Sequence, residues 1–311
     1  MIYHEGALST VSGNSFFWET PPYNRFTEFT EGKNKRLLVL KSVLAEHAIP
    51  FTPVVISGNT HLIAGSGSIK TSHNAAGGRQ EIVLISHYDC AQGSPGANDN
   101  AASVFMLVDA AIKLKKNNSP FRIIFTDKEE ILPGAGIKSQ GSYSLGLGLR
   151  EAGFSNALFF IFDACGTGDT LVISTLADTL LKGGAGESAA RTKKAFSILR
   201  ERALAACERT QQGRYILMPT PFSDDAGFLR AALAAQTITV LPAEEARAFA
   251  ALARSNPLNV LALINRQQQI KRDKLIVPQT WQNFNGPHDT RDLLTTNHFA
   301  DVVRFILALF G

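Results

Sequence analysis

Short apolar segments, separated by stretches of helical periodicity, are the feature that most limits how this chain of 311 residues can fold. The apolar segments lie at 81–86, 121–125, 157–162, 171–174 and 237–241. Runs of this length and composition are typical of strands that are buried on both faces of a sheet. Helical patterns alternate with them at 101–116, 136–151, 187–209, 224–235 and 292–309. This alternation predicts an α/β protein, a three-layer α/β/α sandwich with a central mixed, largely parallel sheet.

The remaining segments fit one domain that spans residues 1–311. Residues 1–27 show no periodicity, 31–48 form an amphipathic helical pattern, and 51–56 and 61–64 resemble strands. Two stretches, 183–221 and 243–286, break the simple alternation of strands and helices. We interpret them as insertions that could form a helical cap over the edge of the sheet.

Composition and charge exclude several functional classes. The chain is 45% hydrophobic, and its net charge of +4 comes from Lys and Arg residues that are scattered through the sequence, so no nucleic-acid partner is expected. Three cysteines without framework spacing argue against a disulfide-stabilised secreted domain. No apolar run reaches the ~20 residues that a membrane span requires. Because no signal peptide is evident either, we expect a cytoplasmic protein without a membrane partner.

Acidic residues and a histidine follow three of the predicted strands. His87 and Asp89 follow 81–86, Asp163 follows 157–162, and the segment after 121–125 contributes Asp127, Glu129 and Glu130. If these strands are parallel, their carboxyl ends meet at one edge of the sheet, where open α/β sheets bind ligands.

A group of carboxylates in a partly buried site cannot remain ionised without a compensating charge. Metal ions supply this charge, and two ions that share a bridging carboxylate would make a hydrolytic site. Such a site needs a second histidine. His288, in the segment NFNGPHDTRD that precedes the last predicted helix, is the candidate.

Five motifs, taken in order, resemble the zinc exopeptidases of clan MH. The motifs are His87-x-Asp89, Gly96-Ala-Asn-Asp99-Asn, Glu129-Glu130, Asp163-Ala-Cys-Gly166 and Pro287-His288-x-Thr-x-Asp292. In particular they resemble metallopeptidase family twenty-eight, the group of aminopeptidase Y and bacterial leucyl aminopeptidase. The region that carries them runs from about residue 30 to the C-terminus.

This resemblance implies a role for each position. The metal ligands would be His87, Asp99, Glu130, Asp163 and His288, and Asp99 would bridge two zinc ions. Cobalt or manganese could replace zinc, because the ligand preferences of these metals overlap. Glu129 would be the general base that activates the attacking water, and Asp89 would orient His87. The resemblance also implies a cis peptide bond between Asp99 and Asn100.

The chain departs from the family pattern at Ser223-Asp224-Asp225, where the family often has Ser-Asp-His. The missing histidine puts any contact of this segment with substrate in doubt. We expect Asp224 to be structural, and to cap the helix that follows. Cys165 stands where the family usually has an apolar residue, and we expect it and Cys90 to be packing residues.

Removal of N-terminal residues from peptides by a two-zinc site is therefore the first hypothesis. A second hypothesis is a different reaction on the same fold. Glutaminyl cyclisation with a single zinc is an example, because glutaminyl cyclases are a related branch of these enzymes. A carboxypeptidase is a further alternative, because Arg291 lies near His288 in sequence and could bind a substrate carboxylate. The last is a binding protein without catalysis.

Overall fold

A computed structural model describes residues 16–32, 35–65, 80–131, 134–210, 214–255 and 277–311 of the chain. In this part of the chain, one eight-stranded sheet has the order β1-β2-β4-β3-β5-β8-β6-β7. The strands are β1 (Phe51–Ile56), β2 (Asn59–Gly65), β3 (Ile82–His87), β4 (Arg122–Thr126), β5 (Leu158–Phe162), β6 (Thr170–Ser174), β7 (Tyr215–Met218) and β8 (Ala235–Leu241).

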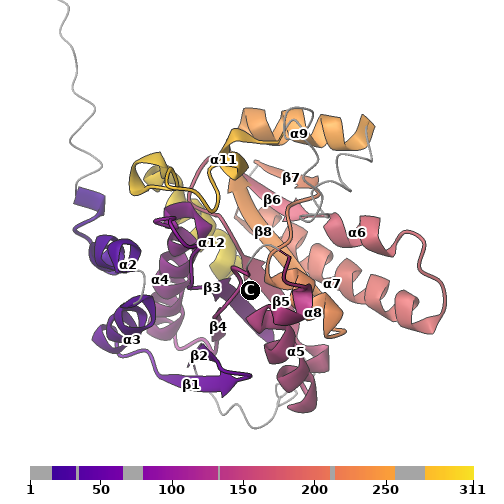
Figure 1. Cartoon of the computed structure of the whole chain (residues 1–311), viewed down its shortest axis with the longest axis horizontal. Helices are drawn as coiled ribbons and strands as arrows, with labels where there is room; N and C mark the ends of the chain where they lie inside the picture. Colours follow the sequence, from indigo (N-terminus) through magenta and orange to yellow (C-terminus); the bar gives the residue numbers. More distant parts are fainter. Residues whose placement is uncertain (1–15, 33–34, 66–79, 132–133, 211–213, 256–276) are drawn as a thin grey trace, which may run out of the picture.

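The centre of the sheet is parallel, and its edges are mixed. β3 lies parallel to both β4 and β5, and β5 lies parallel to β8. β1 and β2 form an antiparallel hairpin that pairs with β4, and β6 runs antiparallel to β8. The hairpin therefore occupies one edge of the sheet, and β7 occupies the other (Figure 1). The predicted mixed, largely parallel sheet is confirmed.

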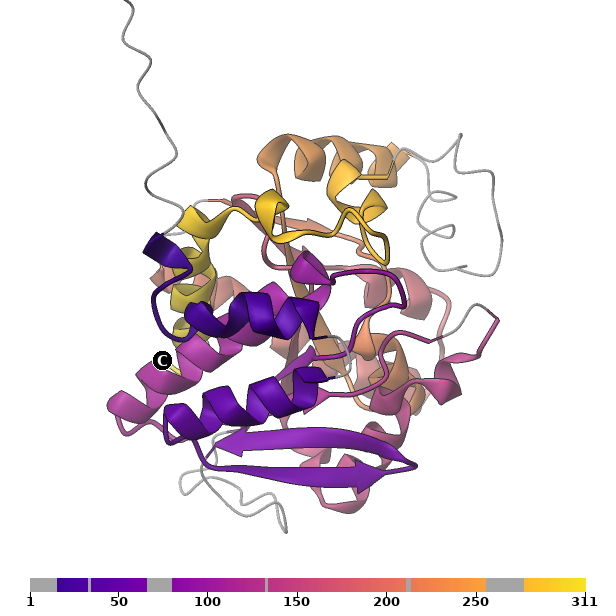
Figure 2. The ribbon, with the colours of Figure 1, turned by 60° about the vertical axis from the view of Figure 1, so that its left-hand side comes forward.

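Helices cover both faces of the sheet, which gives three layers (Figure 1). One face packs against α2 (Phe26–Glu31), α3 (Arg36–Glu46), α4 (Ser103–Lys116), α7 (Glu187–Arg209) and α12 (Phe299–Ala308). The other packs against α5 (Gly141–Glu151), α8 (Asp224–Arg230) and α9 (Ala243–Ser255). Figure 2 shows the β1–β2 hairpin below α3, and α9 at the opposite end of the molecule.

The central strands are apolar throughout because both of their faces are covered. In β3, Leu84 belongs to the core under α4, whereas Val83 and Ile85 belong to the core under α5. All six residues of β3 are buried. Alternate residues of a strand point to opposite faces, so each layer of helices needs its own set of apolar side chains.

The segments interpreted as insertions take different places. In the first, α7 packs against β5 and β8 and against α12, so it belongs to the main helical layer, and β7 is an edge strand that the sequence analysis missed. The expected cap over 183–221 is therefore replaced by a layer helix and a strand. In the second, α9 is followed by residues outside the described part of the chain, and then by α11 (Gln279–Gln282).

Several predicted helices differ at their ends from the observed ones, as α3 (Arg36–Glu46) and α5 (Gly141–Glu151) already show. The last α-helix starts at Phe299, not at residue 292, because the preceding residues form two short 3-10 turns, Arg291–Leu293 and Thr296–His298. α8 ends at Arg230 because Ala232 adopts a positive φ of 60°, which stops the helix five residues before the strand β8 begins at Ala235.

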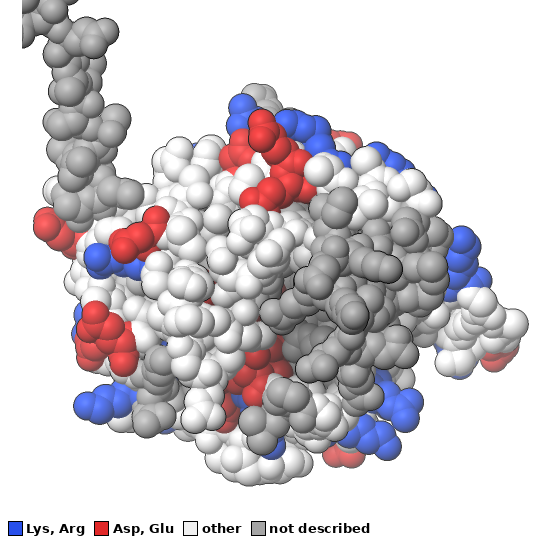
Figure 3. Space-filling view, turned by 45° about the horizontal axis from the view of Figure 1, so that its top comes forward, with Lys and Arg blue, Asp and Glu red and all other residues white. Residues whose placement is uncertain are grey.

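On the face of the molecule that Figure 3 shows, Lys and Arg lie in small groups spread around the margin, and Asp and Glu form separate groups among them. Among the described residues, no helix is both long enough and apolar enough to cross a membrane.

Candidate metal centre

His87 lies at the end of β3 and is the centre of the acidic cluster. Its side chain is fully buried. Its Nε2 atom lies 3.1 Å from Asp99 Oδ1 and 3.7 Å from Asp163 Oδ1. Burial lowers the pKa of His87, but the carboxylates of Asp163, Asp89 and Asp99 outweigh it and raise this pKa well above its usual value. The three residues His87, Asp99 and Asp163 offer ligand atoms within 4.8 Å of one another.

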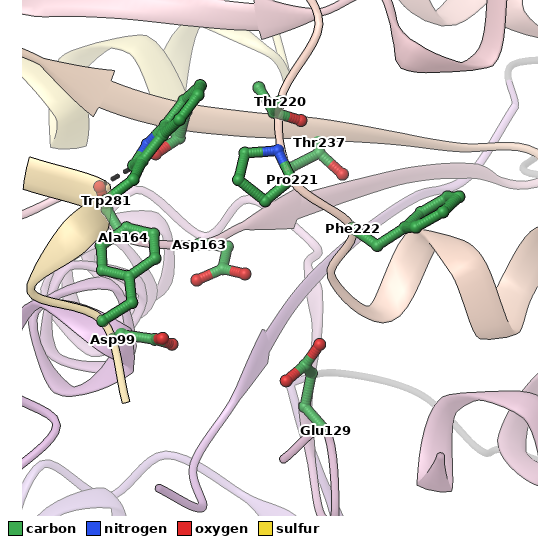
Figure 4. A pocket seen from close by; sticks show the side chains of 11 residues that line it. Asp99, Glu129, Asp163, Ala164, Thr220, Pro221, Phe222, Thr237 and Trp281 are labelled. Atoms are coloured by element: carbon green, nitrogen blue, oxygen red, sulfur yellow. Dashed lines mark hydrogen bonds between the residues drawn. The ribbon is translucent and has the colours of Figure 1, made fainter. Parts of the chain in front are cut away.

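The parallel sheet explains why these residues meet. β3 and β5 are parallel neighbours, with Ile85 opposite Ile161. His87 and Asp163 therefore lie side by side at the carboxyl ends of these strands. Asp99 comes from a distorted turn at Ala97–Ala102 that leads into α4. In Figure 4 the carboxylates of Asp99 and Asp163 point into one pocket, and Glu129 approaches it from the opposite side.

Asn100 joins the two strand ends. Its Nδ2 atom donates to Ser86 Oγ and to the carbonyl oxygen of Phe162, both at 2.9 Å. Its Oδ1 atom accepts the N–H of Ala164 at 3.1 Å. The peptide bond between Asp99 and Asn100 is cis, as the family resemblance implied. No sequence feature indicates the contacts that Asn100 makes.

Asp89 connects His87 to the two glutamates. Its Oδ1 atom lies 3.4 Å from His87 Nδ1. Its two carboxylate oxygens also accept the backbone N–H groups of Glu129 and Glu130, at 3.2 and 3.1 Å. Burial raises the pKa of Asp89, but His87 and these amides outweigh it, and the net pKa is lowered. The carboxylate is therefore held ionised beside the imidazole, as the predicted orienting role requires.

The two glutamates follow β4 and have different surroundings. Glu129 is buried, and its Oε1 atom accepts a hydrogen bond of 2.9 Å from Gln140 Nε2. Glu130 lies beside Asn285, whose side-chain nitrogen donates to Glu130 Oε2 at 2.9 Å when the amide is oriented for hydrogen bonding. Burial, Asp99 and Glu129 raise the pKa of Glu130 to about 10. With His87, the two glutamates form a second group of potential metal ligands.

The residues present fit a divalent metal. Among the described residues, neither ring nitrogen of the buried His87 makes a hydrogen bond of normal geometry, although carboxylate oxygens face both. The raised pKa of Glu130 indicates that the acids of the cluster cannot all ionise without a cation. One imidazole nitrogen with several carboxylate oxygens is a donor set that zinc accepts, and manganese and cobalt accept similar sets.

His288 is placed differently from the other predicted ligands. Its side chain is exposed, and neither group of potential ligands found among the described residues includes it. Its loop nevertheless borders the cluster. The neighbouring Asp289 contacts the turn that carries Asp99, and Asn285 contacts Glu130. Its role as a ligand remains a prediction.

Asp224 does not cap α8. Ser223 occupies the N-cap position, and no side-chain hydrogen bond caps the helix. The fully buried carboxylate of Asp224 instead accepts a hydrogen bond of 2.5 Å from Thr126 Oγ1, at the end of β4. Burial raises the pKa of Asp224 to about 6. Asp224 has a structural role, as expected, but its carboxylate binds the end of β4 and not the start of α8. Cys165 is buried in the core, which confirms its role in packing.

The pocket above the acids has a largely apolar wall. Besides Asp99, Glu129 and Asp163, the residues that line it are Ala164, Thr220, Pro221, Phe222, Thr237, Thr239, Trp281 and Phe284. Figure 4 shows Phe222 and Pro221 on one side of the acids and Trp281 on the other. The aromatic side chains come from the segment before α8 and from α11 and the loop after it, which the sequence analysis did not connect with the site.

The guanidinium of Arg291 is engaged elsewhere. It donates to Thr27 Oγ1 at 2.6 Å and lies over the ring of Trp18, with its carbon 5.4 Å from the ring centre. None of the described residues that line the pocket is Lys or Arg. The described part of the pocket lining thus offers no cation for the carboxylate of a carboxypeptidase substrate.

Comparison with protein families gives one match. The sequence model of peptidase family M28 matches residues 68–269. No curated protein sequence matches the chain significantly.

Solved structures show the same fold at low identity. A zinc aminopeptidase from Bacillus subtilis is 18% identical, with a TM-score of 0.51, and the alignment covers 80% of this chain and 49% of that one. The chain therefore spans about half the length of that relative. A leucine aminopeptidase precursor from Bacteroides thetaiotaomicron is 15% identical, with a TM-score of 0.59 and coverages of 92% and 96%. Glutaminyl cyclase from Porphyromonas gingivalis is 12% identical, with a TM-score of 0.60 and the same coverages.

Proposed function

Since the chain belongs to peptidase family M28, we propose that it is a zinc-dependent aminopeptidase that hydrolyses the N-terminal peptide bond of peptides. The observation that carries this proposal is the meeting of His87 and Asp163, at the carboxyl ends of parallel strands, with Asp99 from the turn before α4 and with Glu129 and Glu130 beside them.

The residues would hold two zinc ions. His87, Asp99 and Asp163 would bind one ion, and Asp99, Glu130 and His288 would bind the second. When bound, zinc would lower the pKa of water and polarise the carbonyl of the scissile bond. Asp89 would orient the imidazole of His87, because its carboxylate lies 3.4 Å from Nδ1 and is itself held by the amides of Glu129 and Glu130.

Glu129 would be the general base. Its carboxylate lines the pocket, and Gln140 fixes one oxygen by a hydrogen bond of 2.9 Å. The carboxylate would take the proton of the attacking water and later pass it to the leaving amine. Adjacent glutamates suit this division, because one can bind metal while the other stays available for proton transfer.

Two observations favour action at the N-terminus of the substrate. The pocket is acidic at its base, which suits a protonated or metal-bound amine, and its described lining contains no cation for a carboxylate. The apolar wall of Phe222, Trp281 and Phe284 would receive the side chain of the first residue. We infer a preference for uncharged N-terminal residues.

The test combines metal content with activity. The purified protein is dialysed, its zinc is measured by elemental analysis, and it is assayed on a panel of aminoacyl anilides and on a glutaminyl peptide, with and without chelator. About two zinc ions per chain with chelator-sensitive release of aniline would support the proposal. One zinc with cyclisation of the glutaminyl peptide and no release would establish the cyclase alternative. No zinc after reconstitution would refute the site.

A further inference from the structure

The loop that joins β3 to the Asp99 turn, residues 88–99, carries both Asp89 and Asp99. It has little regular structure of its own. Two buried charged residues from distant parts of the sequence contact its backbone. Arg36, from α3, contacts carbonyl groups, and Asp289, from the loop after His288, contacts N–H groups.

Arg36 binds four carbonyl oxygens of this loop. Its side chain is only 2% exposed. Nη1 donates to the carbonyls of Tyr88 and Asp89, at 3.2 and 3.1 Å. Nη2 donates to the carbonyls of Pro95 and Gly96, at 2.5 and 3.2 Å. The guanidinium thus joins the beginning of the loop to its end. It also lies over Phe29, 4.8 Å from the ring centre, which fixes its plane.

Close packing at Gly96 shows how tightly this contact is made. Gly96 has a φ of 57°, and a Cβ atom there would lie 2.8 Å from Arg36 Nη2 and 2.7 Å from the Cβ of Cys90. Only glycine combines this backbone conformation with the approach of the guanidinium.

Asp289 binds the other end of the loop through its carboxylate. It is 1% exposed. Its Oδ1 atom accepts the N–H of Asn98 at 2.7 Å, and its Oδ2 atom accepts the N–H of Asp99 at 3.0 Å. Its own carbonyl accepts the N–H of Ala97 at 3.1 Å. Three consecutive amides of the turn are therefore held by one residue, and that residue follows His288 directly.

We propose that Arg36 and Asp289 are positioning residues for the metal centre. Arg36 sets the spacing between Asp89 and the Asp99 turn, and Asp289 fixes the backbone of Asp99 while it holds the His288 segment beside it. Both act on the backbone of the loop. This inference rests on the proposed function, because it assumes that Asp99 and His288 bind metal.

The chemistry of the two side chains makes the assignment specific. A guanidinium presents its N–H groups in a planar fork that can reach four carbonyls at once, whereas a lysine ammonium is a single point with three donors. A carboxylate accepts two parallel N–H groups, whereas an amide offers one acceptor and turns donors towards the other N–H. Arg36→Lys and Asp289→Asn therefore change the size of each side chain little. They remove the arrangement of hydrogen-bonding groups that holds the backbone of the loop.

The experiment measures metal binding in these two variants. Zinc affinity is determined by competition with a chromophoric chelator, and the visible spectrum of the cobalt-substituted protein reports ligand geometry. Outer contacts of metal ligands typically contribute about 10- to 100-fold to affinity. We expect a loss of this size in each variant, together with an altered cobalt spectrum. Thermal unfolding of the metal-free proteins controls for general loss of structure.

Asp178→Asn and Arg200→Lys are matched controls. These residues form an ion pair of 2.8 Å between α6 (Leu176–Leu181) and α7, with half of the Asp178 side chain exposed, and they lie outside the site. Both controls should bind zinc as the wild type does. If Arg36→Lys does not fold, Asp289→Asn decides the question.

Two failures are distinguishable. Folded variants that bind zinc with wild-type affinity and give the wild-type cobalt spectrum would overturn the positioning role while the proposed function stands. A wild-type protein that binds no zinc would overturn the proposed function, and the positioning role with it.

Discussion

His87 and His288 are both predicted metal ligands, but the structure supports them in different ways. His87 ends a central strand, is fully buried, and lies among three carboxylates that other parts of the sheet edge hold in place. His288 lies in an irregular loop, and its side chain is exposed. Its neighbours Asn285 and Asp289 make the contacts that tie this loop to the cluster.

This difference shows how the centre is organised. The half that contains His87, Asp99 and Asp163 is pre-formed, because the parallel strands β3 and β5 end side by side at His87 and Asp163 and the buried turn before α4 brings Asp99 to them. The half that contains His288 depends on a loop that must be docked onto the first half. In the proposed two-zinc site, we therefore expect the ion at His87 to be bound more tightly than the other.

The strongest test of this difference removes each histidine in turn. His87→Ala should lose the tighter ion and reduce hydrolysis to background, because it leaves Asp99 and Asp163 without their imidazole partner. His288→Ala should keep about one zinc per chain and lose the second, since the sheet-based half stays complete. Zinc content after dialysis against increasing chelator, with hydrolysis measured in parallel, gives the answer. Loss of both ions from each variant would contradict the division into two halves.

Glu129→Gln tests a buried residue beside both halves that is predicted not to bind metal. Hydrolysis should fall by about 10²- to 10⁴-fold, the usual contribution of a general base. Zinc content should stay at the wild-type value, since the amide keeps the size of the side chain and its contact with Gln140. The measurement is kcat with zinc analysis of the same sample. Equal loss of zinc would mean that the roles of Glu129 and Glu130 are reversed, and Glu130→Gln is the matched comparison.

Asp224→Asn tests how much the burial of this carboxylate behind the strand ends lowers the free energy of unfolding. Burial raises the pKa of Asp224 from 3.8 in the unfolded chain to about 6 in the folded one. Between these pH values the folded state binds more protons than the unfolded state, so stability falls as pH rises, and the full cost is present above the folded pKa. A cost of about 2–3 kcal/mol at pH 7 follows from this shift. The asparagine variant should avoid it.

The measurement is urea unfolding of the metal-free protein between pH 4 and pH 8. The free energy of unfolding of the variant should depend less on pH than that of the wild type. Asp292→Asn, an exposed change in the His288 region, is the control and should leave the pH dependence unaltered. The same slope in wild type and Asp224→Asn would show that this carboxylate titrates normally.

Phe222→Ala should give the smallest effect, because it changes the pocket wall and leaves the metal ligands in place. We expect KM for substrates with a bulky apolar first residue to rise about fivefold, and KM for alanyl substrates to change little, since one wall of a hydrophobic pocket contributes modestly to discrimination. Steady-state kinetics on the two substrate types are the measurement, with the exposed Leu147→Ala as control. A uniform fall in kcat would place Phe222 nearer the reacting groups.

The strand-end half of the site could be predicted from sequence because its information is local. His87, Glu129 and Asp163 each lie within a few residues of an apolar run, and such runs identify buried strands. Asp99 and His288 lie farther from any strand and were found only through the family motifs. β7 escaped prediction because it is an edge strand of four residues, and only its last residue is buried.

The supporting contacts could not be predicted, because they join residues far apart in the chain. Arg36 reads as one more basic residue of an amphipathic helix, and nothing local shows that it binds Tyr88 and Gly96. Asp289 stands next to a predicted ligand, yet its partners Asn98 and Asp99 are nearly two hundred residues away. The aromatic wall of the pocket likewise combines segments before α8 and after α9.

By itself, the sequence determined the parallel α/β core and the chemical types gathered at its edge, because hydrophobic periodicity and the residues at strand ends are properties of short segments. Only the tertiary structure decided which atoms meet. It set the 3.1 Å approach of His87 to Asp99, the burial of Arg36 and Asp289, and the exposure of His288. Distances of this kind depend on the packing of whole layers against each other, and no single segment encodes them.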